Sequence, residues 1–304
     1  MSSGGRLAFQ LGGLLVMGIG WGGNILLAKL ATSLGAPPIG LAFLEAAGSA
    51  LLLLLASWIR GRPPSLDGRH LRFYTISGAL GVVAPNIAIF HAARHLSAGL
   101  IAILMTLTPL VTYGLSLALR IEPFRWVRAL GLLLGLLGVT LILAPSSSLP
   151  EPGLAGWVVI GFLATAMFAI QNVYIAHAWP RDGDALALSC GGLLASSVML
   201  VPLAGLTEGF IDLVPPWGTV QWAGSAMAAV NALMTALFIA SIRQAGPVFA
   251  SQTAYLITIA GVLWGMLLLH EHHSAWIWAA MLAMCAGVAL VTRPSLRRAS
   301  GALG

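Results

Sequence analysis

Six amide side chains lie inside long apolar stretches of this sequence, where a polar group is costly unless it faces protein or water. They are Asn24, Asn86, Gln171, Asn172, Asn231 and Gln252. Because amides donate and accept hydrogen bonds without a fixed charge, this set can solvate the carboxylate and the ammonium of a zwitterion. Aromatic and thioether side chains in the same stretches can receive an apolar group. These are Trp21, Met105, Tyr174, Tyr255 and Trp264. Together the two sets predict a substrate site of broad specificity.

Ionisable groups are rare in these stretches. Glu45 is the acidic residue well inside one of them, and Lys29 lies in the preceding one. An ion pair between the two is the favoured interpretation, because an unpaired charge in hydrocarbon is expensive. The alternatives are a proton-coupling or ammonium-binding carboxylate at Glu45, or charged ends that reach the membrane interface. His91 and His177 can titrate near neutral pH, although a lone membrane histidine is more often a packing residue.

The run His270-Glu271-His272-His273 resembles a metal site at first sight. Its spacing is not the H-E-x-x-H of helical zinc sites, and no second cluster of Cys, His or Asp accompanies it. We therefore expect a turn at a helix end and no metal. The apolar stretches also show no nucleophile with a base and no paired carboxylates, so the sequence predicts a protein that is not an enzyme.

The elements that position these residues are membrane helices. Apolar residues make up 59% of the chain and charged residues 8%, and the mean hydropathy is +0.94, whereas soluble proteins carry about 25% charged residues. A membrane span needs about 20 apolar residues, and ten such stretches fit. They cover residues 7-31, 36-59, 71-94, 97-119, 124-144, 153-178, 184-206, 217-242, 246-269 and 275-292. The sequence thus predicts an all-α membrane protein.

The distribution of the 15 basic residues predicts the orientation. With the N-terminus in the cytoplasm, all of them except Lys29 and Arg94 fall in inner segments, as the positive-inside rule requires. Both termini are then cytoplasmic in a multi-pass protein of a bacterial-type inner membrane. The net charge of +6 is dispersed over these segments, which suits anionic lipid headgroups and not nucleic acid.

The two halves of the chain are faintly similar. A shift of 149 positions places Arg94 on Arg243 and Glu122 on Glu271. A shift of 148 places Asn24 on Asn172. Five spans per half, an odd number, invert the second half relative to the first, which is typical of transporters. We therefore predict two five-helix repeats, 1-149 and 150-304, around a central cavity.

Glycine and proline residues predict how these helices pack and bend. The Gly18-x-x-x-Gly22 pattern recurs at 131-135 and 261-265 and permits close contact between helix backbones. Pro85 and Pro109 predict bends in the third and fourth stretches. We expect the first, third, sixth, eighth and ninth stretches to line a polar interior, with the fifth and tenth outside it.

Three segments carry a resemblance to a known family: WGGN at 21-24, RIEPFRWVRALGLLLGLLGVTLILAPSS at 120-147, and HEHHSAWIWAAMLAMCAGVALVTRPS at 270-295. They resemble the drug/metabolite transporter superfamily, in which each half is an EamA-type unit of five helices, and within it most nearly the YddG-type exporters of aromatic and other amino acids. The resemblance covers nearly the whole chain. It implies a ten-helix fold with a central cavity, export from the cytoplasm and no cofactor. The sequence departs from the family at Glu45, where many relatives carry Arg.

The expected function is therefore alternating-access export of amino acids, aromatic and other neutral ones, or of related small metabolites, with the lipid bilayer as the surrounding partner. A broad drug or solute efflux carrier of the same fold is the alternative. A nucleotide-sugar carrier would need several basic groups for the phosphates, and Lys29 is the one basic residue well placed for that role. No oligomeric state follows from the sequence.

Overall fold

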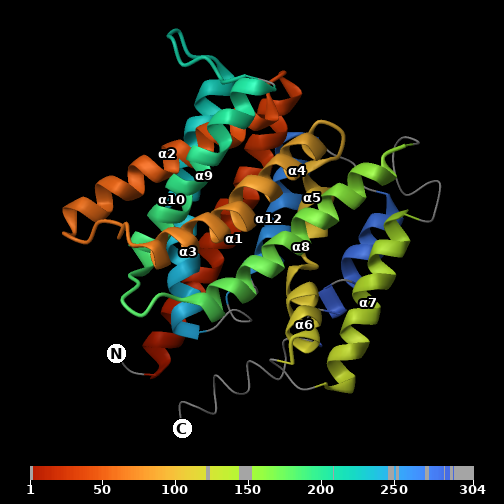
Figure 1. The fold of residues 1–304 in the computed structure, drawn as a ribbon. Helices are drawn as coiled ribbons and strands as arrows, with labels where there is room; N and C mark the ends of the chain where they lie inside the picture. The colour runs from red at the N-terminus through yellow and green to blue at the C-terminus, as the bar shows by residue number, and fades with distance from the viewer. Residues whose placement is uncertain are drawn as a thin grey trace.

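The computed structural model describes residues 3–120, 124–143, 153–207, 209–245, 250, 253–270, 274–283, 285–287 and 290 of the chain. All regular structure in this part is helical (Figure 1). Its labelled elements are α1 (Ser3–Ser33), α2 (Pro38–Ile59), α3 (Gly68–Gly78), η1 (Ala79–Val83), α4 (Ala84–Ala93), α5 (Ala98–Met105), α6 (Thr108–Ala118), α7 (Trp126–Leu143), α8 (Ala155–Ala178), α9 (Ala185–Leu206), α10 (Thr219–Ala245) and α12 (Thr253–Leu268).

Within the described part of the chain, seven helical segments are long and apolar enough to cross a membrane, and they follow seven of the ten predicted stretches. They are Gly12–Ser33, Pro38–Ile59, Gly68–Ala93, Ala98–Ala118, Ala155–Ala178, Ala185–Leu206 and Thr219–Gln244. The other three stretches contain shorter apolar helices, Ala129–Gly138, Thr253–Leu268 and Ala275–Gly287. Seven helices of this kind indicate a multi-pass membrane protein, while the full count of ten spans stays a prediction.

Helix starts follow from local capping. The side chains of Asp67, Ser97 and Asp184 accept hydrogen bonds from backbone N–H groups in the first turns of α3, α5 and α9, which would otherwise have no partner. Asp67 also accepts a 2.7 Å hydrogen bond from Nδ1 of His70. Hydrogen bonds from His70 lower the pKa of Asp67 to about 2, with the larger contribution from the backbone N–H and the smaller one from the side chain.

Proline explains why two of the spans are interrupted. Pro85 has no N–H to offer the carbonyl of Gly81, and its ring crowds the preceding turn. The π-helix η1 lies directly before it, between α3 and α4. Pro109 likewise leaves the carbonyl of Met105 without its helical donor, and Oγ1 of Thr108 donates to that carbonyl at 2.8 Å. The regular α-helix is interrupted next to both prolines, by η1 before Pro85 and by the gap between α5 and α6 before Pro109. The stretch 97-119 is therefore two helices in place of one.

The predicted close approach of glycine backbones is confirmed between α1 and α12. A Cβ atom added to Gly18 would lie 2.1 Å from Cβ of Leu256, and one added to Gly22 would lie 2.7 Å from Cβ of Ala260. Neither distance is possible for real side chains. These two glycines therefore set the distance between the helices.

The remaining helices surround this pair (Figure 1). Helix α1 packs between α10 and α12, α2 packs against α9 and α10, and α8 packs against α4 and α6. Helix α7 lies at the edge of the bundle and contacts α6. The 275–287 helix packs on α7, since a Cβ on Gly287 would lie 2.5 Å from the carbonyl oxygen of Gly131.

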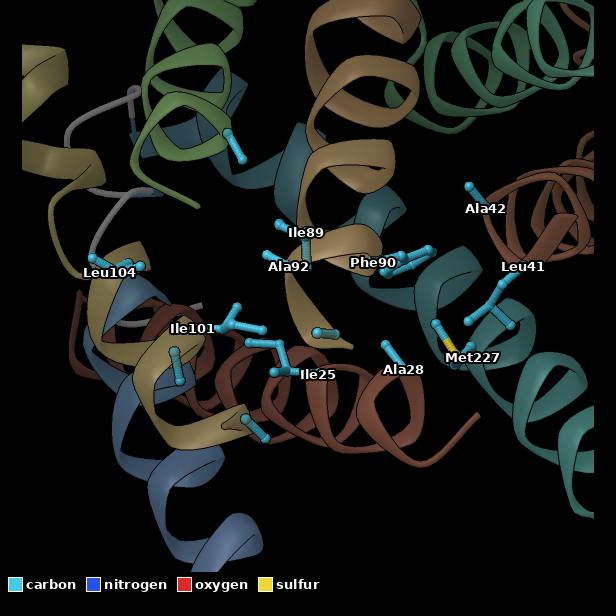
Figure 2. Close-up of a cluster of buried hydrophobic side chains, with 14 of the residues drawn as sticks. Ile25, Ala28, Leu41, Ala42, Ile89, Phe90, Ala92, Ile101, Leu104 and Met227 are labelled. Carbon is cyan, nitrogen blue, oxygen red and sulfur yellow. The ribbon is translucent and has the colours of Figure 1, made fainter. Parts of the chain in front are cut away.

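Apolar side chains fill the space between these helices. Figure 2 shows part of the largest cluster, with Ile25 of α1, Phe90 of α4, Ile101 of α5 and Met227 of α10. Each is less than one-tenth exposed. Dispersion and close packing hold membrane helices together, because lipid supplies no hydrophobic force between them.

Candidate functional site

A cavity of about 150 Å³ lies inside the bundle. Helices α1, α2, η1, α4, α5 and α6 from before residue 149 line it, together with α8, α10 and α12 from after residue 150. Its polar wall consists of Asn24, Glu45, Asn86, Thr108, Gln171, Asn172, Asn231, Thr235 and Thr253. A cavity of this size accommodates about one benzene ring, so larger solutes require it to widen.

Glu45 is the acidic residue on this wall and is only 4% exposed. Its Oε1 accepts a 2.9 Å hydrogen bond from Nδ2 of Asn24, and its Oε2 accepts one of 2.9 Å from Nδ2 of Asn86. Two helices thus hold the carboxylate from either side. Burial of a charge is tolerated only when the protein or a ligand supplies compensating groups.

The expected ion pair between Lys29 and Glu45 is not formed in this structure. Nζ of Lys29 donates to the backbone carbonyl of Ala93 at 2.8 Å, and the salt bridges within the described residues do not include this pair. The reason is position, because Asn24 occupies the face of α1 that meets the carboxylate. Lys29 follows it by five residues and does not line the cavity.

The amide of Asn24 has a fixed orientation. Its Nδ2 donates to Glu45 and, at 3.2 Å, to the carbonyl oxygen of Met227, so both amide protons are used. Asn24 is only 6% exposed. Its buried Oδ1 has no hydrogen-bond partner among the described residues. A buried acceptor without a donor costs about 1–3 kcal/mol, which marks it as a place for an additional donor.

On α8, Asn172 is 2% exposed and lines the same cavity. Among the described residues, no hydrogen bond of its side chain is found. Its neighbour Gln171 donates from Nε2 to the carbonyl of Ser77 at 3.1 Å. The Gln171 carboxamide lies against the π-helix, since a Cβ on Gly81 would be 1.8 Å from its Nε2. A side chain at Gly81 would therefore displace this amide.

A second polar network is centred on Asn231 of α10. Its Oδ1 accepts from Nε1 of Trp21 at 3.1 Å and from Oγ1 of Thr235 at 3.2 Å, while its Nδ2 donates to Oγ of Ser49 at 3.3 Å. The Trp21 ring packs edge-on to Phe238, with ring centroids 5.2 Å apart. These contacts hold Trp21 in one orientation on the cavity wall.

The break between α5 and α6 also lies at the cavity, where Met105 and Thr108 contribute to the wall. Next to the break, the hydroxyls of Thr106 and Thr258 form a short hydrogen bond between α5 and α12. Thr258 also donates to the carbonyl of Ala102 at 2.8 Å. Discontinuous helices near the membrane midplane are typical of transporter substrate sites.

The structure places eight of the predicted site residues on this wall and the others elsewhere. On the wall are Trp21, Asn24, Glu45, Asn86, Met105, Gln171, Asn172 and Asn231. Tyr174 does not line the cavity and stacks on Phe73, with ring centroids 5.8 Å apart. Nδ1 of His91 donates to the carbonyl of Ile87 at 2.7 Å, and His177 is exposed. Tyr255, Trp264 and Lys29 also lie off the wall, whereas Gln252 is outside the described residues.

Sequence reasoning missed the phenylalanines of the wall, which are Phe90, Phe168 and Phe238. Nothing in an all-apolar helix distinguishes a phenylalanine that faces a cavity from one that faces lipid. Thr108 was detectable, since a Thr-Pro pair at a helix break supplies a hydroxyl for the released carbonyl. The described residues hold no group of three or more His, Cys, Asp or Glu suited to a metal ion. Of the 270-273 run, only His270 lies among them.

Comparison with known proteins finds distant bacterial relatives of this chain. Protein PecM of Dickeya dadantii (strain 3937) is 27% identical over 72% of this chain and 75% of its own. The uncharacterized protein PA1977 of Pseudomonas aeruginosa is 26% identical over 93% of this chain and 94% of its own. The uncharacterized transporter YyaM of Bacillus subtilis (strain 168) is 21% identical over 69% of this chain and 70% of its own.

A solved crystal structure has a similar fold, with a TM-score of 0.59 over 93% of this chain and 99% of its own at 20% identity. That likeness concerns the fold alone. The match of residues 9–144 to the model of the EamA-like transporter family agrees with the resemblance noted from the sequence. Over that first part, the chain is therefore similar to the EamA-like transporters. Among the residues that the structure describes, seven helices are long and apolar enough to cross a membrane.

Proposed function

We propose that this protein is a membrane transporter that exports a small solute, an amino acid or a related metabolite, by alternating access around the central cavity. The observation that carries the proposal is that helices from both halves of the chain line one buried cavity with amides on its wall. A site shared by two halves becomes accessible from either side of the membrane when the halves rock against each other.

The chemistry of the wall supports a small, partly apolar solute. The amides and threonines provide donors and acceptors, while Trp21, Phe90 and Phe168 provide flat apolar surface. No lysine or arginine is among the described lining residues, which disfavours phosphorylated solutes such as nucleotide sugars.

The interrupted spans supply places for conformational change. The π-helix η1 and the α5–α6 break both border the cavity, and helix breaks absorb backbone rotation at small cost because their regular hydrogen bonds are already missing. Under this proposal, movement at Gly81 and Thr108 opens the cavity alternately to the two sides. The proposed two-repeat organisation, 1-149 and 150-304, provides two packings of similar free energy.

Counterflow in proteoliposomes tests the function. The purified protein is reconstituted with an unlabelled solute inside, and uptake of the labelled solute is followed for a panel of neutral amino acids and of cationic and neutral drugs. We expect trans-stimulated uptake of amino acids. Exchange of drugs alone supports the alternative, an efflux carrier of broad specificity, and exchange of neither class contradicts the proposal.

A further inference from the structure

We propose that the cavity holds its solute by a protonated amino group, which the carboxylate of Glu45 and Oδ1 of Asn24 bind together. This inference rests on the proposed transport function and names the class of solute: alkylammonium compounds with a small apolar or aromatic body. Three observations carry it, namely the acceptors on the wall, the charge of the wall and the shape of the remaining surface.

The first observation is an excess of acceptors around Glu45. Each carboxylate oxygen accepts one hydrogen bond in the structure, from Asn24 and from Asn86, and a carboxylate has about four acceptor positions. Oδ1 of Asn24 adds a buried acceptor that no described residue partners. It cannot exchange places with Nδ2 by an amide flip, because Nδ2 already donates to Glu45 and to the carbonyl of Met227. An ammonium group offers three N–H donors, which is the complement of this arrangement.

The second observation is the charge of the wall. Glu45 is acidic, and the described residues that line the cavity include no lysine, arginine or histidine. Basic and titratable groups on the helices around α2 donate to backbone carbonyls: Lys29 to Ala93, His91 to Ile87 and Cys190 to Ala50. A carboxylate in a bundle interior is costly without a cation. A cationic solute supplies that compensation in the bound state.

The third observation is the apolar surface beside this acceptor group. Phe90, Phe168 and Phe238 line the cavity, and Trp21 is held by Asn231 and Phe238. The volume of about 150 Å³ is that of a cavity that takes up a benzene ring. A single ring or a branched aliphatic group therefore matches the cavity as it stands, and a short amine attached to it requires a modest widening. Asn172 is available for a further polar group such as a carboxylate.

Three compounds of one ring size separate these features: phenethylamine, phenylalanine and 3-phenylpropionate. They carry an ammonium alone, an ammonium with a carboxylate, and a carboxylate alone. Binding is measured on the full-length protein in detergent, as the shift of its melting midpoint with compound concentration. We expect phenethylamine and phenylalanine to bind and stabilise the protein. The affinity for 3-phenylpropionate should be lower by on the order of tenfold to a hundredfold, the effect of one charge-assisted hydrogen-bonded contact. The ratio of the first two shows whether a free amine or an amino acid is preferred.

The matched variants are Glu45→Gln and Glu45→Asp. The first removes the charge and keeps the shape. It should lower the affinity for both ammonium compounds by the same order, about tenfold to a hundredfold, and leave the affinity for 3-phenylpropionate unchanged. The second keeps the charge and should retain most of the binding. If Glu45→Gln does not fold, the comparison of compounds on the unmodified protein still decides. Equal stabilisation by 3-phenylpropionate, or none by any of the three, overturns ammonium recognition, while counterflow of other solutes would leave the transport function standing.

Discussion

Substitution of Gly18 by alanine should separate α1 from α12. The added Cβ would lie 2.1 Å from Cβ of Leu256, and also 2.9 Å and 3.0 Å from the backbone carbonyl carbon and Cα of the same residue. Ordinary contacts of Cβ atoms begin near 3.4 Å. Because backbone atoms of Leu256 lie in the way, a change of rotamer gives no relief, and the helices must move apart by roughly 1 Å.

The expected cost is about 1–3 kcal/mol, the usual effect of overpacking a tight contact. Gly23→Ala is the matched control, since it lies in the same helix and a Cβ there meets no atom within 4 Å. Alanine at this half-buried position should be neutral or stabilise by about 0.5–1 kcal/mol, because the added Cβ has open space and glycine is a poor helix former.

Apparent melting midpoints of the two variants in detergent, at one heating rate, provide the assay. We expect Gly18→Ala to melt several degrees below the unmodified protein and Gly23→Ala to melt at or above it. Equal midpoints for the two variants would refute the contact between α1 and α12 as described.

Three further predictions concern function, topology and pH. In Gly81→Ala the new Cβ would lie 1.8 Å from Nε2 of Gln171, so the Gln171 carboxamide should move into the cavity. Counterflow should then fall by about tenfold while the melting midpoint changes little. Unchanged counterflow would contradict this role of the π-helix. Cysteines at Gly68 and at Thr207 should react with impermeant reagents only from the cytoplasm and only from outside, respectively, as the basic residues predict; the reverse labelling would invert the orientation. Asp67→Ala should lower the melting midpoint above pH 4, and this effect should vanish as the pH falls towards 2. The reason is that the pKa of the Asp67 carboxyl is lowered to about 2 in the folded protein, so its stabilisation of the helix start is lost on protonation. An effect that is constant with pH would contradict the capping role.

Much of the fold could be predicted from the sequence, because membrane helices follow from apolar length and their interruptions follow from proline. The seven long segments lie where hydropathy places them, and the breaks lie at Pro85 and Pro109. Gly18 and Gly22 indicated a close helix contact correctly. The partner of that contact, α12, does not follow from the pattern, since small residues show only that a backbone can approach.

The candidate site was predictable in part for the same reason. Amides such as Asn24 and Asn172 must face protein or water, so their types alone indicate the interior. Tyr255 and Trp264 tolerate many environments, and a helix that is apolar all round gives no sign of which face meets the cavity. Glu45 pairs with the amides of Asn24 and Asn86 and not with Lys29. Which of these side chains faces Glu45 depends on how each helix is rotated about its own axis, and the local sequence does not determine that rotation.

The most direct test of a transport site in the central cavity is counterflow by Asn172→Leu. This residue is 2% exposed and lines the cavity, and leucine has the same branching and number of heavy atoms as asparagine but lacks the amide. Thr140→Val on α7, a helix that does not line the cavity, is the control. We predict that Asn172→Leu folds with a midpoint like that of the unmodified protein and loses at least about 90% of counterflow, while the control keeps it. Full counterflow in a folded Asn172→Leu protein would contradict the account.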